Sequence, residues 1–209
     1  VPGNFSSTAE LGEIAAAMAP YGGVYISHLR SEANNLLEAI DEAIEIGARG
    51  GVPVEIFHLK AAGQENWHKA AQAIAKIDSA RAAGVDVQAN MYPYTAGSTG
   101  LTSCFPPSAS ANGRLFRNLA DTRARARIRA EIENQTEDWE NLCALATPAS
   151  VLLLGFNNAE NRRRYSGRYL DDIAREFGKD WIETAMDLVL DERQRIGTVF
   201  FMMSEDNLR

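Results

Sequence analysis

The sequence is poor in cysteine and histidine and has no long apolar run. Its 209 residues include two cysteines and three histidines, and the formal net charge is −7. No apolar run is long enough to span a membrane, so we expect no membrane partner, and no signal peptide is visible in the sequence. The acidic balance argues against a general nucleic-acid surface. Two cysteines make no disulfide framework, and they favour a reducing, cytoplasmic location.

The composition is that of an ordinary globular domain. Strand and helix patterns alternate through its first hundred residues. Short β-branched segments at 24–28, 52–58 and 85–92 predict strands. Segments at 34–49 and 67–83 carry apolar residues at helical spacing and predict helices. Short loops between such units imply parallel strands joined by right-handed crossovers.

Two architectures fit this repeat, a doubly wound sheet and a (β/α)8 barrel. No glycine-rich fingerprint lies between a strand and its helix, which argues against dinucleotide binding. Each strand ends instead on a polar side chain: His28, His58 and Asn90. Because barrel enzymes carry their sites at the carboxyl ends of the strands, we predict an α/β fold built as a partial (β/α)8 TIM-type barrel.

The pattern divides the chain into three parts of one incomplete catalytic domain. Residues 1–100 are predicted to form barrel βα units, ending in a small-residue loop at 95–100. Residues 101–170 are predicted to form a mostly helical insertion over the rim, and residues 171–209 return to the barrel pattern with an apolar strand at 198–203. A part-barrel exposes strand edges, so we expect self-association.

The two histidines that end neighbouring predicted strands are candidates for metal binding or acid–base chemistry. His28 and His58 lie thirty residues apart at matching positions. Zinc suits neutral imidazole nitrogen, but a catalytic zinc normally has three protein ligands and a water. His68 is expected at the surface, and Cys104 and Cys143 lie in the irregular region and are not expected to bind metal. The residues therefore predict two ligands and leave a third unidentified.

Lys60 lies two residues after His58, on the same face of the predicted strand. It could bind an anionic substrate group, form a rim salt bridge, or act as a Schiff-base amine if desolvation lowered its pKa. Tyr92 and Ser98 follow the next strand, where their hydroxyls either reach the same anion or take part in turns. A lysine-dependent aldolase-type barrel and a non-catalytic structural or binding fragment therefore stay open.

Several short motifs occur in a fixed order. They are His-Leu-Arg-Ser-Glu at 28–32, His-Leu-Lys at 58–60, Asn66-Trp67, Tyr92-Pro93-Tyr94 and Gly97-Ser98-Thr99, with further segments at 165–178 and 198–209. Together they resemble the N-acyl-D-amino-acid deacylases (D-aminoacylases), zinc-dependent members of the amidohydrolase superfamily.

The resemblance implies hydrolysis of the amide bond of a small-molecule N-acyl-D-amino acid, giving a D-amino acid and a carboxylate. It implies that His28 and His58 bind zinc, with one or two ions in the complete enzyme. It also implies that Lys60, Tyr92 and Ser98 hold the substrate carboxylate, a role that an ammonium and two hydroxyls suit chemically. An aspartate on the last strand would move the proton.

The chain departs from the family pattern at one residue and in three segments. Asn90 stands where the family commonly has an acidic residue, which bears on local hydrogen bonding. A His-x-His, the metal-binding cysteine segment and a Gly-Ser-Asp with the catalytic aspartate do not occur in the sequence. We therefore expect an internal portion of such an enzyme, inactive by itself.

Overall fold

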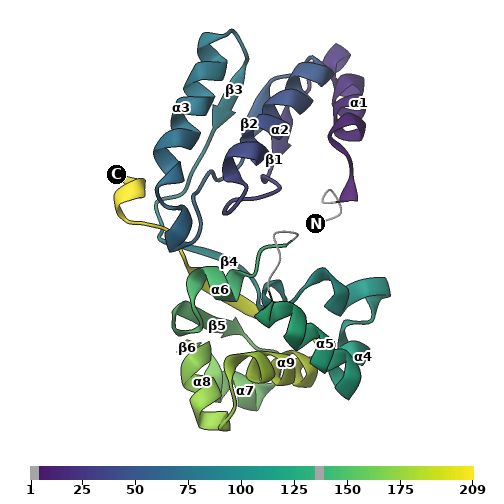
Figure 1. The fold of residues 1–209 in the computed structure, drawn as a ribbon, viewed down its shortest axis with the longest axis vertical. Helices are drawn as coiled ribbons and strands as arrows, with labels where there is room; N and C mark the ends of the chain where they lie inside the picture. Colours follow the sequence, from purple (N-terminus) through teal and green to yellow (C-terminus); the bar gives the residue numbers. More distant parts are fainter. Residues whose placement is uncertain (1–4, 135–138) are drawn as a thin grey trace. The chain divides into compact units, whose positions relative to one another are not determined.

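The computed structural model describes residues 5–134 and 139–209 (Figure 1). The chain divides into two compact units, Val1–Tyr94 with Met203–Arg209, and Thr95–Met202. In the described part of the chain, no helix is long and apolar enough to cross a membrane.

The first unit is a parallel sheet whose strands are connected by helices. Its strands, in the order β1-β2-β3, are β1 (Tyr25–Ser27), β2 (Val54–Ile56) and β3 (Val87–Ala89). Helix α1 (Thr8–Met18) precedes β1, α2 (Leu36–Gly50) connects β1 to β2, and α3 (Lys69–Ala82) connects β2 to β3. The predicted strand–helix repeat is confirmed here, with strands shorter than the sequence indicated.

Alternation along the strands sorts the side chains onto two faces of the sheet. Val54, Ile56 and Val87 are buried against α2 and α3. Full burial of one such side chain contributes about 1.5–3 kcal/mol. The opposite face carries the paired residues Ile26, Glu55 and Gln88, of which Ile26 is 56% exposed. The helices of this unit therefore cover only one face of the sheet.

Two local features set how α1 and α2 lie. Ser7 caps α1, because its Oγ accepts a hydrogen bond from the Glu10 backbone N–H at 3.1 Å. Gly47 allows α2 to approach β2 closely: a Cβ there would lie 2.1 Å from Val54 Cγ2. Only glycine fits this contact without displacing the helix.

The second unit contains an antiparallel sheet with the order β4-β7-β5-β6. Its strands are β4 (Ala96–Gly100), β5 (Val151–Gly155), β6 (Arg168–Tyr169) and β7 (Gly197–Phe201). Its helices are α4 (Leu115–Ala120), α5 (Thr122–Glu133), α6 (Leu142–Ala146), α7 (Ala159–Tyr165), α8 (Leu170–Phe177) and α9 (Trp181–Glu192). Short 3₁₀ helices occur at Ala19–Tyr21, Gln64–Asn66, Leu101–Cys104, Pro107–Gly113, Pro148–Ser150 and Asp206–Leu208.

The strands of the second unit differ from the sequence prediction. Residues 95–100 were predicted to be a loop, but Ala96–Gly100 pairs along its whole length with β7. The apolar strand at 198–203 was predicted to return to a parallel barrel, but β7 runs antiparallel to both β4 and β5. An apolar run does not encode the direction of its partner, and glycine-rich segments have low intrinsic strand propensity. The predicted part boundaries at 101 and 170 accordingly fall inside Thr95–Met202.

The cysteines provide a further correction. Cys104 and Cys143 form a disulfide bond, and both side chains are fully buried. They lie 39 residues apart, and the packing of α6 against Leu101–Cys104 brings them together. No local sequence motif indicates such a pairing. Because the two cysteines are paired in this structure, they do not favour a reducing compartment, and that prediction from the cysteine count is wrong.

Candidate metal centre

Three potential metal ligands meet at the carboxyl ends of β1 and β2. His28 follows β1 directly, His58 lies two residues after β2, and Glu32 lies in the loop between β1 and α2. One ligand atom from each of the three lies within 4.8 Å of the other two. The imidazole ring centroids of the histidines are 4.9 Å apart. The structure therefore brings the two histidines together, as the strand repeat predicted.

Glu32 is the member of this cluster that sequence reasoning did not assign. Its Oε1 lies 3.0 Å from His28 Nδ1 and 2.9 Å from His58 Nδ1, and it also contacts Lys60 Nζ. The only sequence signal was its place at the end of the His-Leu-Arg-Ser-Glu motif. Two imidazoles and a carboxylate form a donor set that zinc uses in catalytic sites, so the side chains present fit a divalent metal.

The surroundings keep the Glu32 carboxyl ionised. Burial raises the pKa of this group, but hydrogen bonds with His28 and His58 and the positive charge of Lys60 outweigh burial and lower the pKa to about 2. The side chain is only 12% exposed, so these partners replace most of its solvent. A permanent negative charge therefore lies between the two imidazoles.

Lys60 is almost completely buried, with 7% of its side chain exposed. Burial lowers the pKa of the ammonium, and the neighbouring Glu32 opposes this shift. Its Nζ also lies 2.8 Å from His58 Nδ1 and 5.5 Å from the centroid of the Tyr92 ring. The observed partner of Lys60 is thus Glu32, which corresponds to the salt-bridge alternative. The matching cation after β1, Arg30, pairs elsewhere, with Glu42 at 2.8 Å.

The two hydroxyls of the predicted carboxylate clamp lie in different units. Tyr92 belongs to the first unit, with its ring centroid 6.1 Å from that of His58. Burial, together with the charge of Glu32, raises the pKa of Tyr92 to about 12, so its hydroxyl stays protonated and can donate. Ser98 lies in β4 of the second unit, where its hydroxyl donates to the Thr198 carbonyl at 3.1 Å. The cluster in the first unit therefore contains His28, His58, Lys60 and Tyr92 of the predicted residues.

Asn90 holds the segment that carries His58. Its Oδ1 accepts a hydrogen bond from the His58 backbone N–H at 2.8 Å, and its Nδ2 donates to Glu55 Oε1 at 2.7 Å. The backbone of His58 has φ 41°, a left-handed conformation that is uncommon outside glycine. This turn ends β2 before His58. His58 and Lys60 therefore do not share a strand face, contrary to the prediction. Asn90 therefore takes part in local hydrogen bonding, which its departure from the family pattern had put in doubt.

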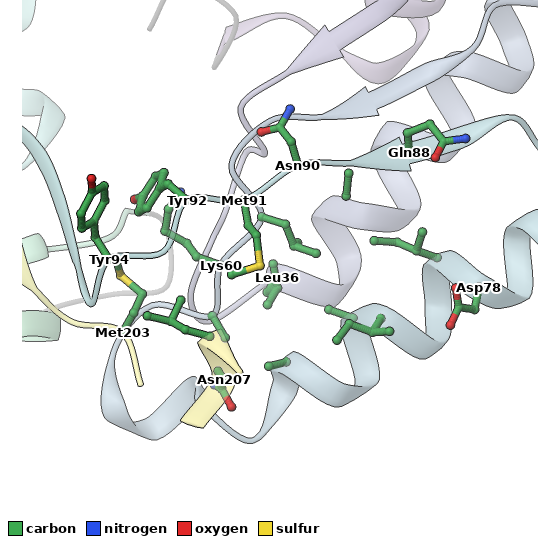
Figure 2. Close-up of a pocket in the computed structure, with 18 of the residues that line it drawn as sticks. Leu36, Lys60, Asp78, Gln88, Asn90, Met91, Tyr92, Tyr94, Met203 and Asn207 are labelled. Atoms are coloured by element: carbon green, nitrogen blue, oxygen red, sulfur yellow. The ribbon is translucent and has the colours of Figure 1, made fainter. Parts of the chain in front are cut away.

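A cavity of about 450 Å³ adjoins Lys60 within the first unit (Figure 2). Its walls include apolar side chains of α2 and α3 and residues of the segment that follows β3. Figure 2 shows Lys60, Tyr92 and Tyr94 toward one end and Asp78 toward the other. The cavity could hold a small molecule with its anionic group near Lys60 and an apolar part along α3.

Comparisons with known proteins show what this chain is similar to. No family model matches it. N-acyl-D-glutamate deacylase of Alcaligenes xylosoxydans xylosoxydans is 41% identical over 98 residues, 47% of this chain and 20% of that protein. D-aminoacylase of the same organism is 27% identical over 208 residues, 100% of this chain but 33% of that protein. The chain thus spans at most about a third of these relatives.

Solved structures agree with the sequence matches. A D-aminoacylase described as defining a novel subset of amidohydrolases superposes with TM-score 0.66 at 29% identity, over 100% of this chain and 34% of the other. N-acyl-D-glutamate deacylase of Bordetella bronchiseptica, complexed with zinc and a phosphonate mimic of the tetrahedral intermediate, gives TM-score 0.70 at 26% identity, over 99% of this chain and 34% of the other.

The homologues of this chain are therefore amidohydrolases with an α/β fold. More specifically, they are N-acyl-D-amino-acid deacylases, and the resemblance seen in the sequence motifs is confirmed.

Proposed function

We propose that this chain carries part of the active site of a zinc-dependent deacylase that hydrolyses the amide bond of N-acyl-D-amino acids. The observation that carries the proposal is the meeting of His28, Glu32 and His58 at the ends of adjacent parallel strands. Such a cluster at the carboxyl edge of a parallel sheet is where barrel enzymes hold their metals.

In this proposal His28 and His58 hold the zinc. When bound, the metal supplies Lewis acidity toward the amide carbonyl and lowers the pKa of water. The chain's own contribution is to fix the two imidazoles 4.9 Å apart, centroid to centroid, beside an ionised carboxylate. An aspartate elsewhere in the complete enzyme would move the proton.

Lys60 and Tyr92 of the first unit are proposed to bind the substrate carboxylate, and for Ser98 this role stays a prediction from the sequence motifs. Tyr92 supports this role because its hydroxyl stays protonated, and Lys60 supports it because it is one of the residues that line the cavity. For Lys60 the substrate carboxylate would have to share the ammonium with Glu32. The pairing with Glu32 also opposes the neutral amine that a lysine-dependent aldolase needs.

We propose that the first unit is part of a (β/α)8 barrel. Helices cover one face of its parallel sheet, and the other face carries Ile26, Glu55 and Gln88. Among the described residues, β1 and β3 each have one strand neighbour. Exposed edges of this kind favour self-association of the isolated chain, and a monodisperse monomer in sedimentation would count against it.

The isolated chain is proposed to be inactive, since it matches only about a third of D-aminoacylase. The test combines zinc analysis with a deacylation assay on N-acyl-D-glutamate, N-acyl-D-aspartate and an apolar N-acyl-D-amino acid. We expect stoichiometric zinc in the wild type and its loss in H28N and H58N, with H68N as the matched control. Zinc retained by both variants would refute the metal site, and zinc-dependent turnover by the 209-residue chain would refute the inactivity.

A further inference from the structure

We propose that Asn66 and Lys69 are positioning residues that hold together the two loops carrying the proposed metal site. One loop follows β1 and carries His28, and the other follows β2 and carries His58. The inference rests on the proposed function and adds two residues to it, neither of which is a proposed metal ligand. The Asn66-Trp67 motif of the sequence thereby gains a role.

Asn66 is a buried polar residue that contacts both loops. It is only 2% exposed, and its Nδ2 donates to the Ala62 carbonyl at 3.0 Å in its own loop and to Asn34 Oδ1 at 3.1 Å in the loop after β1. Its Oδ1 accepts a hydrogen bond from Lys69 Nζ at 2.7 Å. A buried amide is costly unless its hydrogen bonds are made, so these bonds favour the arrangement in which the two loops meet.

Lys69, the first residue of α3, adds further bonds between the loops. Its Nζ donates to the Asn34 carbonyl at 2.8 Å and to the Ala33 carbonyl at 3.4 Å, in addition to Asn66 Oδ1. The ammonium thus uses its three donors on two loops, and all three acceptors are uncharged oxygens. A cation is unfavourable at a helix N-terminus, so the stability of α3 itself does not account for a lysine here. Its contacts with the loop after β1 do.

A backbone hydrogen bond joins the same two loops beside the proposed site. The Ala62 N–H donates to the Glu32 carbonyl at 2.8 Å. The side chain of Glu32 forms the buried ion pair with Lys60, which lies in the loop after β2. The Ala62 amide therefore reports whether the two loops are in contact close to the site.

The C-terminal segment is attached to the same part of the loop after β2. Asn207 Nδ2 donates to the Trp67 carbonyl at 2.9 Å, across 140 positions of the chain. Because Met203–Arg209 belongs to the first unit, residues 62–69 join three segments of that unit. A functional site needs its side chains held within about 0.5 Å by supporting contacts, which is what such a network supplies.

A purely structural role for Lys69 is the alternative. In that case its removal would lower the stability of the first unit as a whole, and the folded molecules would keep the site unchanged. The two roles can be separated because hydrogen exchange measures the opening of individual amides as well as global unfolding.

Native-state hydrogen exchange followed by NMR tests the contact between the loops. In K69M we expect the Ala62 amide to exchange about 10-fold faster or more, because hydrogen bonds to a charged group are lost. The Val54 amide, which donates to the Asp86 carbonyl at 2.9 Å between β2 and β3, should exchange as in the wild type. An equal rise at Ala62 and Val54 would indicate global destabilisation and overturn the positioning role.

Lys76 provides the matched control on the same helix. It pairs with Asp41 of α2 at 2.8 Å and contacts neither loop, so K76M should leave exchange at Ala62 unchanged. N66A removes the amide itself and should raise exchange at Ala62 at least as much as K69M. Unchanged protection of Ala62 in both K69M and N66A would overturn the proposal. Circular dichroism verifies that each variant is folded, and K69Q replaces K69M where the latter is not.

Zinc titration measures the consequence for the proposed metal site. We expect K69M to bind zinc about 10-fold more weakly than the wild type, at the lower end of what lost supporting contacts cost a metal site, and K76M to bind it equally well. Equal zinc affinity of K69M and the wild type would overturn the positioning role. Absence of zinc binding in the wild type would instead refute the proposed metal site, and exchange at Ala62 would still decide whether Lys69 joins the loops.

Discussion

Lys60 and Glu32 form an ion pair that is nearly shielded from water, with side chains 7% and 12% exposed. The two residues lie 28 positions apart, after β2 and β1 respectively. A buried pair of this kind adds little net stability compared with apolar residues of the same shape, but removing one partner leaves an uncompensated charge. Single and double substitutions can therefore separate the cost of removing one partner from the net contribution of the pair to stability.

We expect Lys60→Met to lower the unfolding free energy by about 1–3 kcal/mol, because Glu32 then keeps only its histidine partners. The double variant K60M/E32Q should recover part of the loss, since no buried charge remains. Urea denaturation of the wild type, both single variants and the double variant gives the coupling energy. Strictly additive effects would mean that the two side chains do not interact in solution.

Asn90 is expected to be sensitive to charge. In N90D the residue still accepts the His58 N–H, but it can no longer donate to Glu55 Oε1, now 2.7 Å from another carboxylate. We expect a loss of about 1–2 kcal/mol at neutral pH from the unmade bond and the repulsion. E55Q/N90D should restore stability, because the glutamine amide can donate to the new aspartate. Equal stability of N90D and the double variant would contradict this account.

The sequence predicted the histidine pair because the pattern that encodes it is local. His28 and His58 each follow a short apolar strand, and parallel strands bring their ends to one edge. Glu32 could not be placed this way. It lies in an irregular loop, and its partner Lys60 is 28 residues further along, so no strand or helix period links them.

In the second unit, local helices were predicted and long-range pairings were not. Residues 101–170 were predicted to be mostly helical, and α4, α5, α6 and α7 lie in this range, because capping and apolar spacing act within a few residues. The antiparallel pairing of β4 with β7 and the bond between Cys104 and Cys143 were missed. Both join segments whose association depends on the packing of the whole unit.

Glu192 should make the stability of the second unit depend on pH. Burial raises the pKa of its carboxyl, but the Asn161 side chain, the backbone N–H groups of Asn158 and Asn157, and the Gln194 side chain outweigh this and lower the pKa below its usual range. These donors lie 2.6 to 3.1 Å from its oxygens. A lowered folded pKa contributes stability that is complete above the unfolded value of about 4.3 and is lost as the pH falls below it.

The test compares wild type with Glu192→Gln. At pH 7 we expect E192Q to be less stable by about 1–3 kcal/mol, because a neutral amide cannot accept the same set of hydrogen bonds. The difference should stay constant down to about pH 5 and shrink at lower pH. The exposed E160Q, at the start of α7, serves as a control with the same charge change. A stability difference that grows on acidification would contradict a lowered pKa of Glu192 in the folded state.

The disulfide between Cys104 and Cys143 should contribute to the stability of the second unit by closing a loop across 39 positions. A native disulfide over such a loop contributes roughly 2–4 kcal/mol, largely by restricting the unfolded chain. We expect no free thiol by Ellman titration of the denatured, unreduced chain, and a lower unfolding free energy after reduction or in C104A/C143A. Both side chains are fully buried, so the double alanine variant also loses packing. Reduction of the wild type isolates the bond itself, and the single variants C104A and C143A should each expose one titratable thiol. Two free thiols in the untreated chain would show that the cysteines are unpaired in solution.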